Sequence, residues 1–213
     1  MDERTTGLIL RTRPLTETSL IVHWLTPNFG RVATVAKGAR RPKSPFAGKL
    51  DLFYVADFSF SRSRSSDLHN LREVKLRETH AAIRQDMTKL QQAGYAAAFI
   101  EQATETDTPI PEIFELMRGF LKHLCEQKPQ PQNVFALELK LLRELGLEPD
   151  FKETHLTPGA KKIVQTLADS DWTKGSRLKL SDAQSNELRQ FLHGFLIFHL
   201  GKLPRGRTMA LAN

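Results

Sequence analysis

Hydrophobic periodicity changes once along this 213-residue chain, near residue 80, and that change limits the folds the chain can adopt. Before residue 80, short apolar runs alternate with polar residues and turn signals, which is typical of β-strands. After it, apolar residues recur at i, i+4 and i+7, as they do on one face of an α-helix. No flexible linker separates the two patterns. The sequence therefore predicts an α+β, multi-domain chain, with one domain in residues 1–80 and an all-α helical domain in residues 81–213.

The first domain contains five short β-like runs and no helix long enough to cross over between parallel strands. The runs cover residues 8–10, 19–25, 31–36, 50–60 and 71–76. A turn of sequence Pro-Asn-Phe-Gly at residues 27–30 predicts a hairpin between the second and third runs. A small antiparallel barrel closes such a set without free edges. Five strands fit an oligonucleotide-binding (OB) barrel, and strand propensity alone does not separate it from an SH3-like barrel.

Strict alternation predicts which strand residues share a face. In residues 50–60 it groups Leu52, Tyr54, Ala56, Phe58 and Phe60 on one face. In the last run it places Leu71 and Val74 on opposite faces. Phe58 and Phe60 are expected in the core, because they share a face with Leu52.

The helical domain shows several helices with recognisable ends. The first starts at about residue 81, with the stripe Ile83, Met87, Leu90, Gly94 and Ala97. A second follows Ile113, Leu116, Phe120 and Leu124, and a third runs from Val134 to a stop at Gly146. Thr157 before Pro158 predicts an N-cap, and Ser181 with Gln184 matches a capping box at the start of the last helix.

The strongest binding signal is the basic segment 37–43, which reads Lys-Gly-Ala-Arg-Arg-Pro-Lys and follows the third β-like run. Its glycine and proline favour a loop over a helix. Lys and Arg side chains on such a loop donate to phosphate oxygens and displace condensed counterions. A solvated surface turn is the competing interpretation of the same residues.

Charge is distributed unevenly along the chain, whose formal net charge is +7. Residues 1–80 hold 14 Lys and Arg against 8 Asp and Glu, residues 81–150 hold 7 against 11, and residues 151–213 hold 10 against 5. A basic beginning and end therefore flank an acidic middle. This pattern favours a polyanionic partner for the basic parts and a scaffold role for the middle.

Other cations and aromatic side chains of the predicted barrel extend the binding hypothesis, because stacking platforms beside a cationic groove hold single strands. The predicted nucleic-acid-binding residues are Lys37, Arg40, Arg41, Lys43, Arg31, Arg11, Arg13 and Trp24. Trp24 flanks the hairpin turn, where a core position is an equal alternative. Residues 202–207 form a second cationic patch or, equally, a frayed and solvated tail.

Catalytic and metal-binding signals are weak. The chain has a single cysteine, Cys125, so an internal disulfide and a cysteine-based zinc site are excluded. It lacks a nucleophile elbow, a phosphate-binding Gly-Lys-Ser/Thr loop and a zincin motif. We therefore predict no catalytic residues, no metal and no cofactor. The absence of a signal peptide and of a long apolar run predicts a cytoplasmic protein without membrane contact.

Six stretches are informative through their order and spacing. They are residues 7–10 with 17–20 (Gly-Leu-Ile-Leu, Glu-Thr-Ser-Leu), 26–31 (Thr-Pro-Asn-Phe-Gly-Arg), 36–41 (Ala-Lys-Gly-Ala-Arg-Arg), 138–149 (Glu-Leu-Lys-Leu-Leu-Arg-Glu-Leu-Gly-Leu-Glu-Pro) and 191–201. Together, and over essentially the whole chain, they resemble the bacterial RecO family of DNA repair proteins, which are recombination mediators.

The resemblance implies an N-terminal OB barrel followed by a helical domain, and no cofactor turnover. It also implies binding of single- and double-stranded DNA, annealing of complementary strands and action in the RecFOR pathway at the bacterial nucleoid. The implied partners are RecR and the C-terminal tail of single-stranded DNA-binding protein, with RecA loaded indirectly. The DNA role carries over to Lys37, Arg40 and Arg41. Many relatives have a four-cysteine zinc module after the Gly-Leu-Glu-Pro turn, whereas residues 151–156 here contain no cysteine.

Two other functions compete with a non-enzymatic mediator. One is a protein-interaction scaffold for which DNA contact is incidental, since the acidic segment 81–150 suits a basic partner. The other is an enzyme that acts on nucleic acid, which is the weakest because no acid cluster for metal ions is evident.

Overall fold

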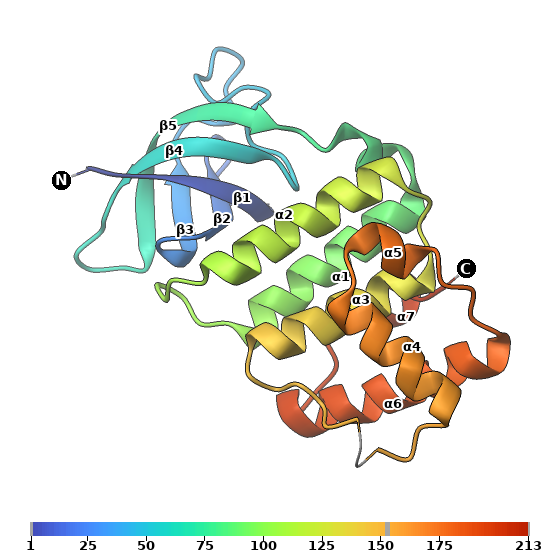
Figure 1. Cartoon of the computed structure of the whole chain (residues 1–213). Coiled ribbons are helices and arrows are strands. Elements are labelled where there is room, and N and C mark those ends of the chain that lie inside the picture. The colour runs from blue at the N-terminus through green and yellow to red at the C-terminus, as the bar shows by residue number, and fades with distance from the viewer. Residues whose placement is uncertain (1, 152–153, 213) are drawn as a thin grey trace. The chain divides into compact units, whose positions relative to one another are not determined.

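The computed structural model describes residues 2–151 and 154–212 (Figure 1). The described residues form two compact units. One consists of the chain up to Ala81 together with Thr104–Arg118, and the other of Ala82–Ala103 together with the chain from Gly119 onward. The first unit is a β-barrel with an added segment, and the second is helical. The α+β fold class is thus confirmed, whereas the boundary at residue 80 stays a prediction.

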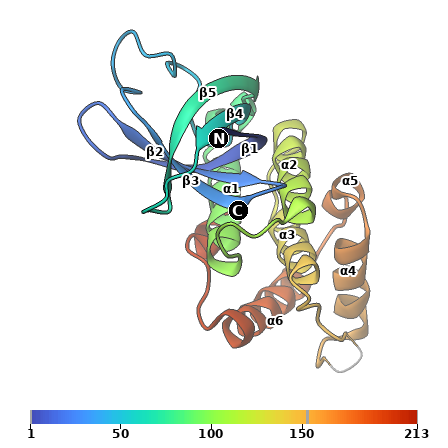
Figure 2. The same cartoon turned by 90° about the vertical axis from the view of Figure 1, so that its left-hand side faces the viewer.

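The barrel is built from five strands, β1 (Asp2–Pro14), β2 (Leu20–Thr26), β3 (Gly30–Ala36), β4 (Val55–Ser61) and β5 (Leu68–Glu78). They close in the order β1-β2-β3-β5-β4, and β2 and β3 form the predicted hairpin (Figure 2). The fully antiparallel arrangement was wrong, because β3 and β5 are parallel. Strand directions that alternate around a ring of five must leave one pair of neighbours pointing the same way.

Aromatic side chains fill the barrel interior. The rings of Trp24 and Phe58 stack with centroids 4.1 Å apart, and the Trp24 indole Nε1 donates to Thr34 Oγ1 at 2.8 Å. Gly7 lies beside this stack, where a Cβ would come within 2.6 Å of the Phe58 ring. The remaining core is largely aliphatic and aromatic: Ile9, Val22, Val32, Ala36, Phe46, Ala56, Phe60, Leu71 and Val74.

Two departures from strict alternation explain where the face predictions failed. Phe53 has φ of 63°, which interrupts the extended backbone, so β4 begins only at Val55. Leu71 and Val74 are both buried in the core, although alternation placed them on opposite faces. The pairing of β4 with β5 shifts by one residue between Ser59 and Phe60, and such a bulge resets the side-chain alternation.

Residues 104–118, which include the first half of the helix Pro111–Glu126, belong to the barrel unit although residues of the helical unit precede and follow them in the sequence. Arg31 Nε donates to Thr104 Oγ1 at 2.9 Å, and Thr106 forms an isolated β-bridge with Gly30. Gly30 has φ of 62°, and a Cβ there would lie 2.0 Å from the Thr108 carbonyl oxygen. The hairpin turn therefore needs glycine both for its own conformation and for this close approach.

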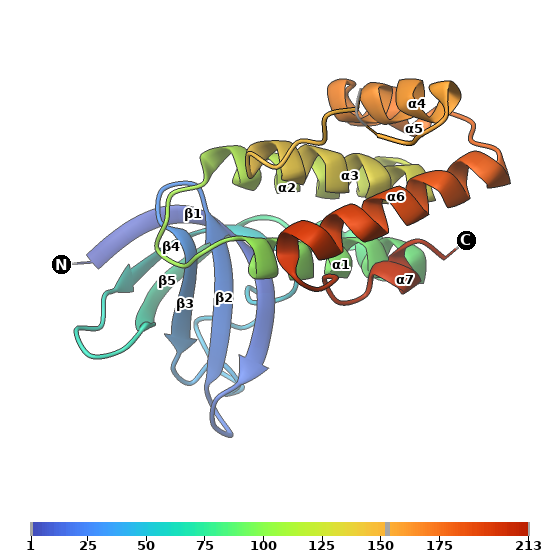
Figure 3. The same cartoon turned by 90° about the horizontal axis from the view of Figure 1, so that it is seen from below.

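The helices are α1 (Met87–Ala103), α2 (Pro111–Glu126), α3 (Pro131–Glu144), α4 (Pro158–Asp169), α5 (Trp172–Ser176), α6 (Asp182–Leu200) and α7 (Arg207–Ala210), with a short 3-10 turn at Ala81–Gln85. In the helical unit, α3 packs against α4, α5 and α6, and α7 packs against α1 (Figure 3). The short helices α5 and α7 were not predicted, because neither is long enough to show periodicity.

Helix ends were predicted well and the first apolar stripe was not. Thr157 Oγ1 accepts from the Ala160 amide, and the Ser181–Gln184 capping box is present. Gly146 ends α3 with φ of 72°. In contrast, Met87 and Gly94 are exposed, although the predicted stripe included both. The helix α1 also starts six residues later than expected. Its buried face consists of Gln92, Ala93, Tyr95, Ala96, Ala97, Phe99 and Ile100.

A buried ion pair joins α3 to the C-terminal segment of the helical unit. Arg207 Nε donates to Glu138 Oε1 at 2.7 Å, and the Tyr95 hydroxyl donates to the same oxygen at 2.5 Å. Burial, followed by the Glu138 charge, raises the pKa of Tyr95 well above its ordinary value. The frayed-tail interpretation of residues 202–207 is therefore wrong at Arg207, which is held inside the unit.

We predict that Gly7→Ala destabilises the barrel by about 1–3 kcal/mol, because the new methyl group overpacks the Trp24–Phe58 stack. Chemical denaturation of the full chain measures this change. Gly94→Ala is the matched control, because its Cβ meets no atom within 4 Å in an exposed helical position. It should stabilise α1 by roughly 0.5–1 kcal/mol. Equal stabilities for the two variants would contradict the packing described for Gly7.

Candidate nucleic-acid interface

The basic segment 37–43 is a loop of successive turns, as predicted. Gly38 adopts φ of 69°, and the Arg41 amide donates to the Gly38 carbonyl at 3.1 Å. Two bonds join this loop to the β1–β2 turn: the Arg40 amide donates to Thr18 O at 3.0 Å, and Arg40 Nη1 donates to Thr16 O at 3.3 Å. The four predicted cations of the loop, Lys37, Arg40, Arg41 and Lys43, are exposed. The backbone is therefore held while the charges face solvent.

A second group of cations lies on the outer face of β1, β2 and β3. Arg11 pairs with His23 across β1 and β2, and Arg13 pairs with Ile21. Arg31 pairs with Leu25 across β2 and β3. Paired residues of an antiparallel ladder point to the same side of the sheet, so the three arginines and the histidine share one face. We call Arg11, Arg13, His23 and Arg31 the outer-face cluster.

The structure brings the predicted arginines of this cluster together but gives them different surroundings. Arg11 and Arg13 are exposed. Arg31 is half-buried and also donates from Nη2 to the Thr104 carbonyl at 2.5 Å, so part of its role is to fasten residues 104–118 to the barrel. Contact between these arginines and nucleic acid remains a prediction.

His23 was missed by the sequence analysis. Burial, and then the charges of Arg11, Arg13 and Arg31, lower the pKa of His23 from its ordinary value to about 4. Its Nε2 atom is buried without a hydrogen-bond partner. A lone histidine in a strand carries no functional signal, and only the register between β1 and β2 shows that it faces Arg11.

The prediction that Trp24 stacks on bases is wrong for this conformation. Its side chain is fully buried, its ring packs on Phe58 and its indole N–H is occupied by Thr34. The barrel interior needs a large apolar side chain at this position, and composition alone does not distinguish an inward-facing from an outward-facing aromatic residue.

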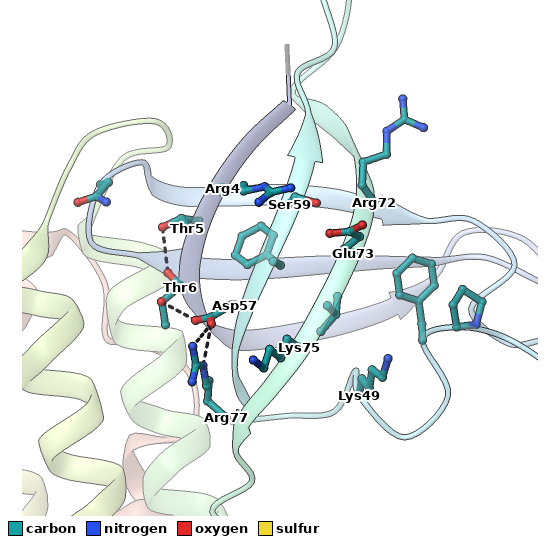
Figure 4. A pocket seen from close by; sticks show the side chains of 15 residues that line it. Arg4, Thr5, Thr6, Lys49, Asp57, Ser59, Arg72, Glu73, Lys75 and Arg77 are labelled. Carbon is teal, nitrogen blue, oxygen red and sulfur yellow. Dashed lines mark hydrogen bonds and ion pairs between the residues drawn. The ribbon is translucent and has the colours of Figure 1, made fainter.

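A hollow of about 890 Å³ lies over β1, β4 and β5 of the barrel (Figure 4). Its lining includes five cations that the sequence analysis did not select: Arg4, Lys49, Arg72, Lys75 and Arg77. The Arg77 guanidinium donates from Nε to Asp57 Oδ2 at 2.7 Å and holds the pKa of that carboxyl below its ordinary value. Lys75 and Arg77 alternate along β5, a pattern that could have indicated a basic strand face.

The described residues contain no group of three or more His, Cys, Asp or Glu side chains that could hold a metal ion. Lys152 and Glu153, in the stretch where the resemblance raised the question of a zinc module, lie outside the part of the chain that the structure describes. None of the helices described here is long and apolar enough to cross a membrane.

The chain combines a closed five-stranded barrel of the OB type, which displays cations on a loop and on its strands, with a helical unit. Barrels of this type form a class of domains that bind oligonucleotides or oligosaccharides. Comparison with known families identifies the family within this class. Residues 1–80 match the family described as "Recombination protein O N terminal", and residues 84–157 match "Recombination protein O C terminal". The chain belongs to the RecO family of DNA repair proteins.

Individual relatives agree with this assignment. The "DNA repair protein RecO" of Rhodopirellula baltica is 32% identical over 143 residues, which are 67% of this chain and 53% of that protein. The protein of the same name from Bacillus subtilis (strain 168) is 31% identical over 144 residues, or 68% of this chain and 56% of the relative. The protein of the same name from Bacillus pumilus is 27% identical over 205 residues, which are 92% of this chain and 79% of the relative. The chain spans about half the length of the first of these relatives.

We predict that Trp24→Phe lowers barrel stability by about 1–3 kcal/mol, because Thr34 Oγ1 loses its buried partner. The same change should leave the salt dependence of DNA binding as it is in the wild type, because Trp24 is buried. Denaturation and binding titrations with single-stranded oligothymidylate measure the two effects. A lost affinity in a folded variant would restore Trp24 as a contact residue.

We also predict that His23 makes the barrel sensitive to acid. Its pKa is lowered on folding, so between pH 6.5 and about 4 the unfolded chain binds a proton that the folded chain does not. Stability is therefore full above pH 6.5 and falls as the pH approaches 4. Melting temperatures across this range should fall less steeply for His23→Gln, which cannot be protonated, than for the wild type. Parallel profiles would contradict the buried, neutral state of His23.

Proposed function

We propose that this member of a DNA repair family is a non-enzymatic recombination mediator that binds single- and double-stranded DNA. On this proposal the basic loop 37–43 and the arginines of the outer-face cluster hold the phosphate backbone. The observation that carries it is the loop, whose backbone is tied to the β1–β2 turn while its four cations remain exposed. Both sets of cations rest on the same three strands, β1, β2 and β3.

Annealing follows from the same chemistry. Two complementary strands repel each other through their phosphates, and bound cations reduce this repulsion before base pairing begins. No covalent bond changes in such a reaction, so neither a nucleophile nor a metal ion is needed. The proposed protein lowers the barrier to encounter by neutralising charge.

In the cell, the proposed mediator assists the loading of RecA onto DNA that is coated with single-stranded DNA-binding protein. Its proposed partners are RecR and the C-terminal tail of the coating protein. Family membership supports these partners, and we assign none of them to particular residues. We place this activity at the bacterial nucleoid, where the DNA substrates lie.

The alternative function is a protein-interaction scaffold whose DNA contact is incidental. The acidic helical segment supports it, since residues 81–150 carry more Asp and Glu than Lys and Arg. The two functions differ in what the loop charges do. A mediator loses annealing activity without them, whereas a scaffold keeps its affinity for an acidic, apolar peptide.

We predict that Arg40→Ala combined with Arg41→Ala weakens DNA binding and flattens its salt dependence. Neutralising about five phosphates of a single strand gives a log–log salt slope of roughly −3 to −4, and losing two contacts should reduce its magnitude by about 1.4. The measurements are binding of single-stranded oligothymidylate and annealing of labelled oligonucleotides precoated with single-stranded DNA-binding protein, each at several salt concentrations.

The matched control combines Arg177→Ala with Lys179→Ala, which removes the same charge from exposed positions of the helical unit. Net charge is then equal in the two variants, so a difference between them reports the position of the cations. An unchanged slope in the Arg40/Arg41 variant would contradict the proposed role of the loop. Failure of the wild type to accelerate annealing would favour the scaffold.

A further inference from the structure

The outer-face cluster contains a histidine whose situation the DNA-binding proposal leaves unexplained. Arg11 and Arg13 approach His23 from β1, and Arg31 approaches from β3. These three cations are the charged groups of the described residues that shift its pKa, and no carboxylate is among them. Ala33, the β3 partner of His23, has no charge to contribute.

The hydrogen-bonding capacity of the cluster points to an anion. Guanidinium groups are donors only, and a protonated imidazole is a donor at both nitrogens. His23 Nε2 is buried without a partner, so a proton taken up there meets no internal acceptor and lies in a strongly positive region. An oxygen that carries negative charge can accept from several of these donors at once, and the planar arginine fork suits phosphate oxygens.

We propose that the outer-face cluster is a seat for a phosphate group of bound DNA, and that His23 takes up a proton when this seat is filled. This inference rests on the proposed function and adds a residue and a regulation to it. DNA binding at the barrel is then coupled to pH, and acid tightens it. The loop cations of residues 37–43 supply affinity at all pH values, because lysine and arginine remain charged.

The coupling follows from the charges alone. In the free protein, burial and three arginines oppose a positive charge on the imidazole, so His23 is neutral near pH 7. A bound phosphate offsets the repulsion from the arginines and stabilises the imidazolium. Because linkage is reciprocal, a ligand that favours protonation is itself bound more tightly by the protonated protein. Direct contact between Nε2 and the phosphate would strengthen the effect and is not required for it.

The expected size of the effect is set by how far DNA restores the protonation of His23. If bound DNA returns the pKa of His23 to its ordinary value, DNA affinity at pH 5.5 should exceed DNA affinity at pH 8 by about tenfold through this residue alone. A phosphate that lies further from the cluster raises the affinity in acid by a smaller factor. General effects of pH on the other histidines are common to the wild type and its variants.

The first experiment measures binding of single-stranded oligothymidylate by fluorescence anisotropy, from pH 5.5 to pH 8 at constant ionic strength. The proteins are the wild-type chain, His23→Gln and the control His193→Gln, which removes an exposed histidine of α6. We expect the wild type and His193→Gln to bind more tightly in acid. The ratio of affinities at pH 5.5 and pH 8 should be about tenfold smaller in His23→Gln than in the wild type. Melting curves establish that each variant is folded over the range.

The second experiment follows the imidazole protons of the wild type by NMR during pH titration, with and without the oligonucleotide. The signal that is missing in His23→Gln identifies the group, and DNA should move its titration midpoint upward. In Arg11→Ala the midpoint of the free protein should already be higher, so DNA should move it less.

The outcomes separate the two proposals. Wild-type binding that has the same pH dependence as His23→Gln, together with an unmoved midpoint, overturns the phosphate seat and leaves the DNA-binding proposal intact. Absence of binding at every pH overturns the proposed function and this inference with it. A midpoint that DNA moves downward would show that the strand passes elsewhere and that His23 opposes it.

Discussion

The barrel depends on one packed aromatic pair, Trp24 against Phe58, which fills its interior beside Gly7. A filled interior has no room for charge, because an unpaired ion away from water costs many kcal/mol. The cations of the first 80 residues are therefore displayed on loops and on the outer strand faces. The proposed binding surface is in this sense a consequence of the core. Trp24 fills the barrel interior and is therefore unavailable as a stacking platform.

Display of like charges on one strand face creates a second constraint. Three arginines that share a face repel one another and any further positive charge, and this repulsion, after burial, keeps His23 neutral. Such a face gains most from a ligand that removes the repulsion, which is a general reason why clustered arginines bind phosphate more readily than scattered ones. In the helical unit, by comparison, the buried Arg207 is paired with a carboxylate, that of Glu138.

The fold was largely predictable from local pattern, whereas the arrangement of the proposed binding residues was predictable only in part. The hairpin, the basic loop and the helix caps near Thr157 and Ser181 rest on residues close together in the sequence. The segment at residues 104–118 was assigned to the helical domain by its neighbours in the chain, whereas Gly30 and Arg31 bind it to the barrel unit. No local signal reports an attachment that is made across more than 70 residues.

The sequence by itself determined the fold class, the strand count, the basic loop and the family, because each depends on periodicity, turn chemistry or the order of short motifs. Only the tertiary structure decided that Trp24 faces inward, that Leu71 and Val74 share the core, and that His23 lies among three arginines. The physical reason is strand register. A shift of one residue moves every side chain to the other face, and register is set by bulges and by pairing between distant strands rather than by the residues of one strand.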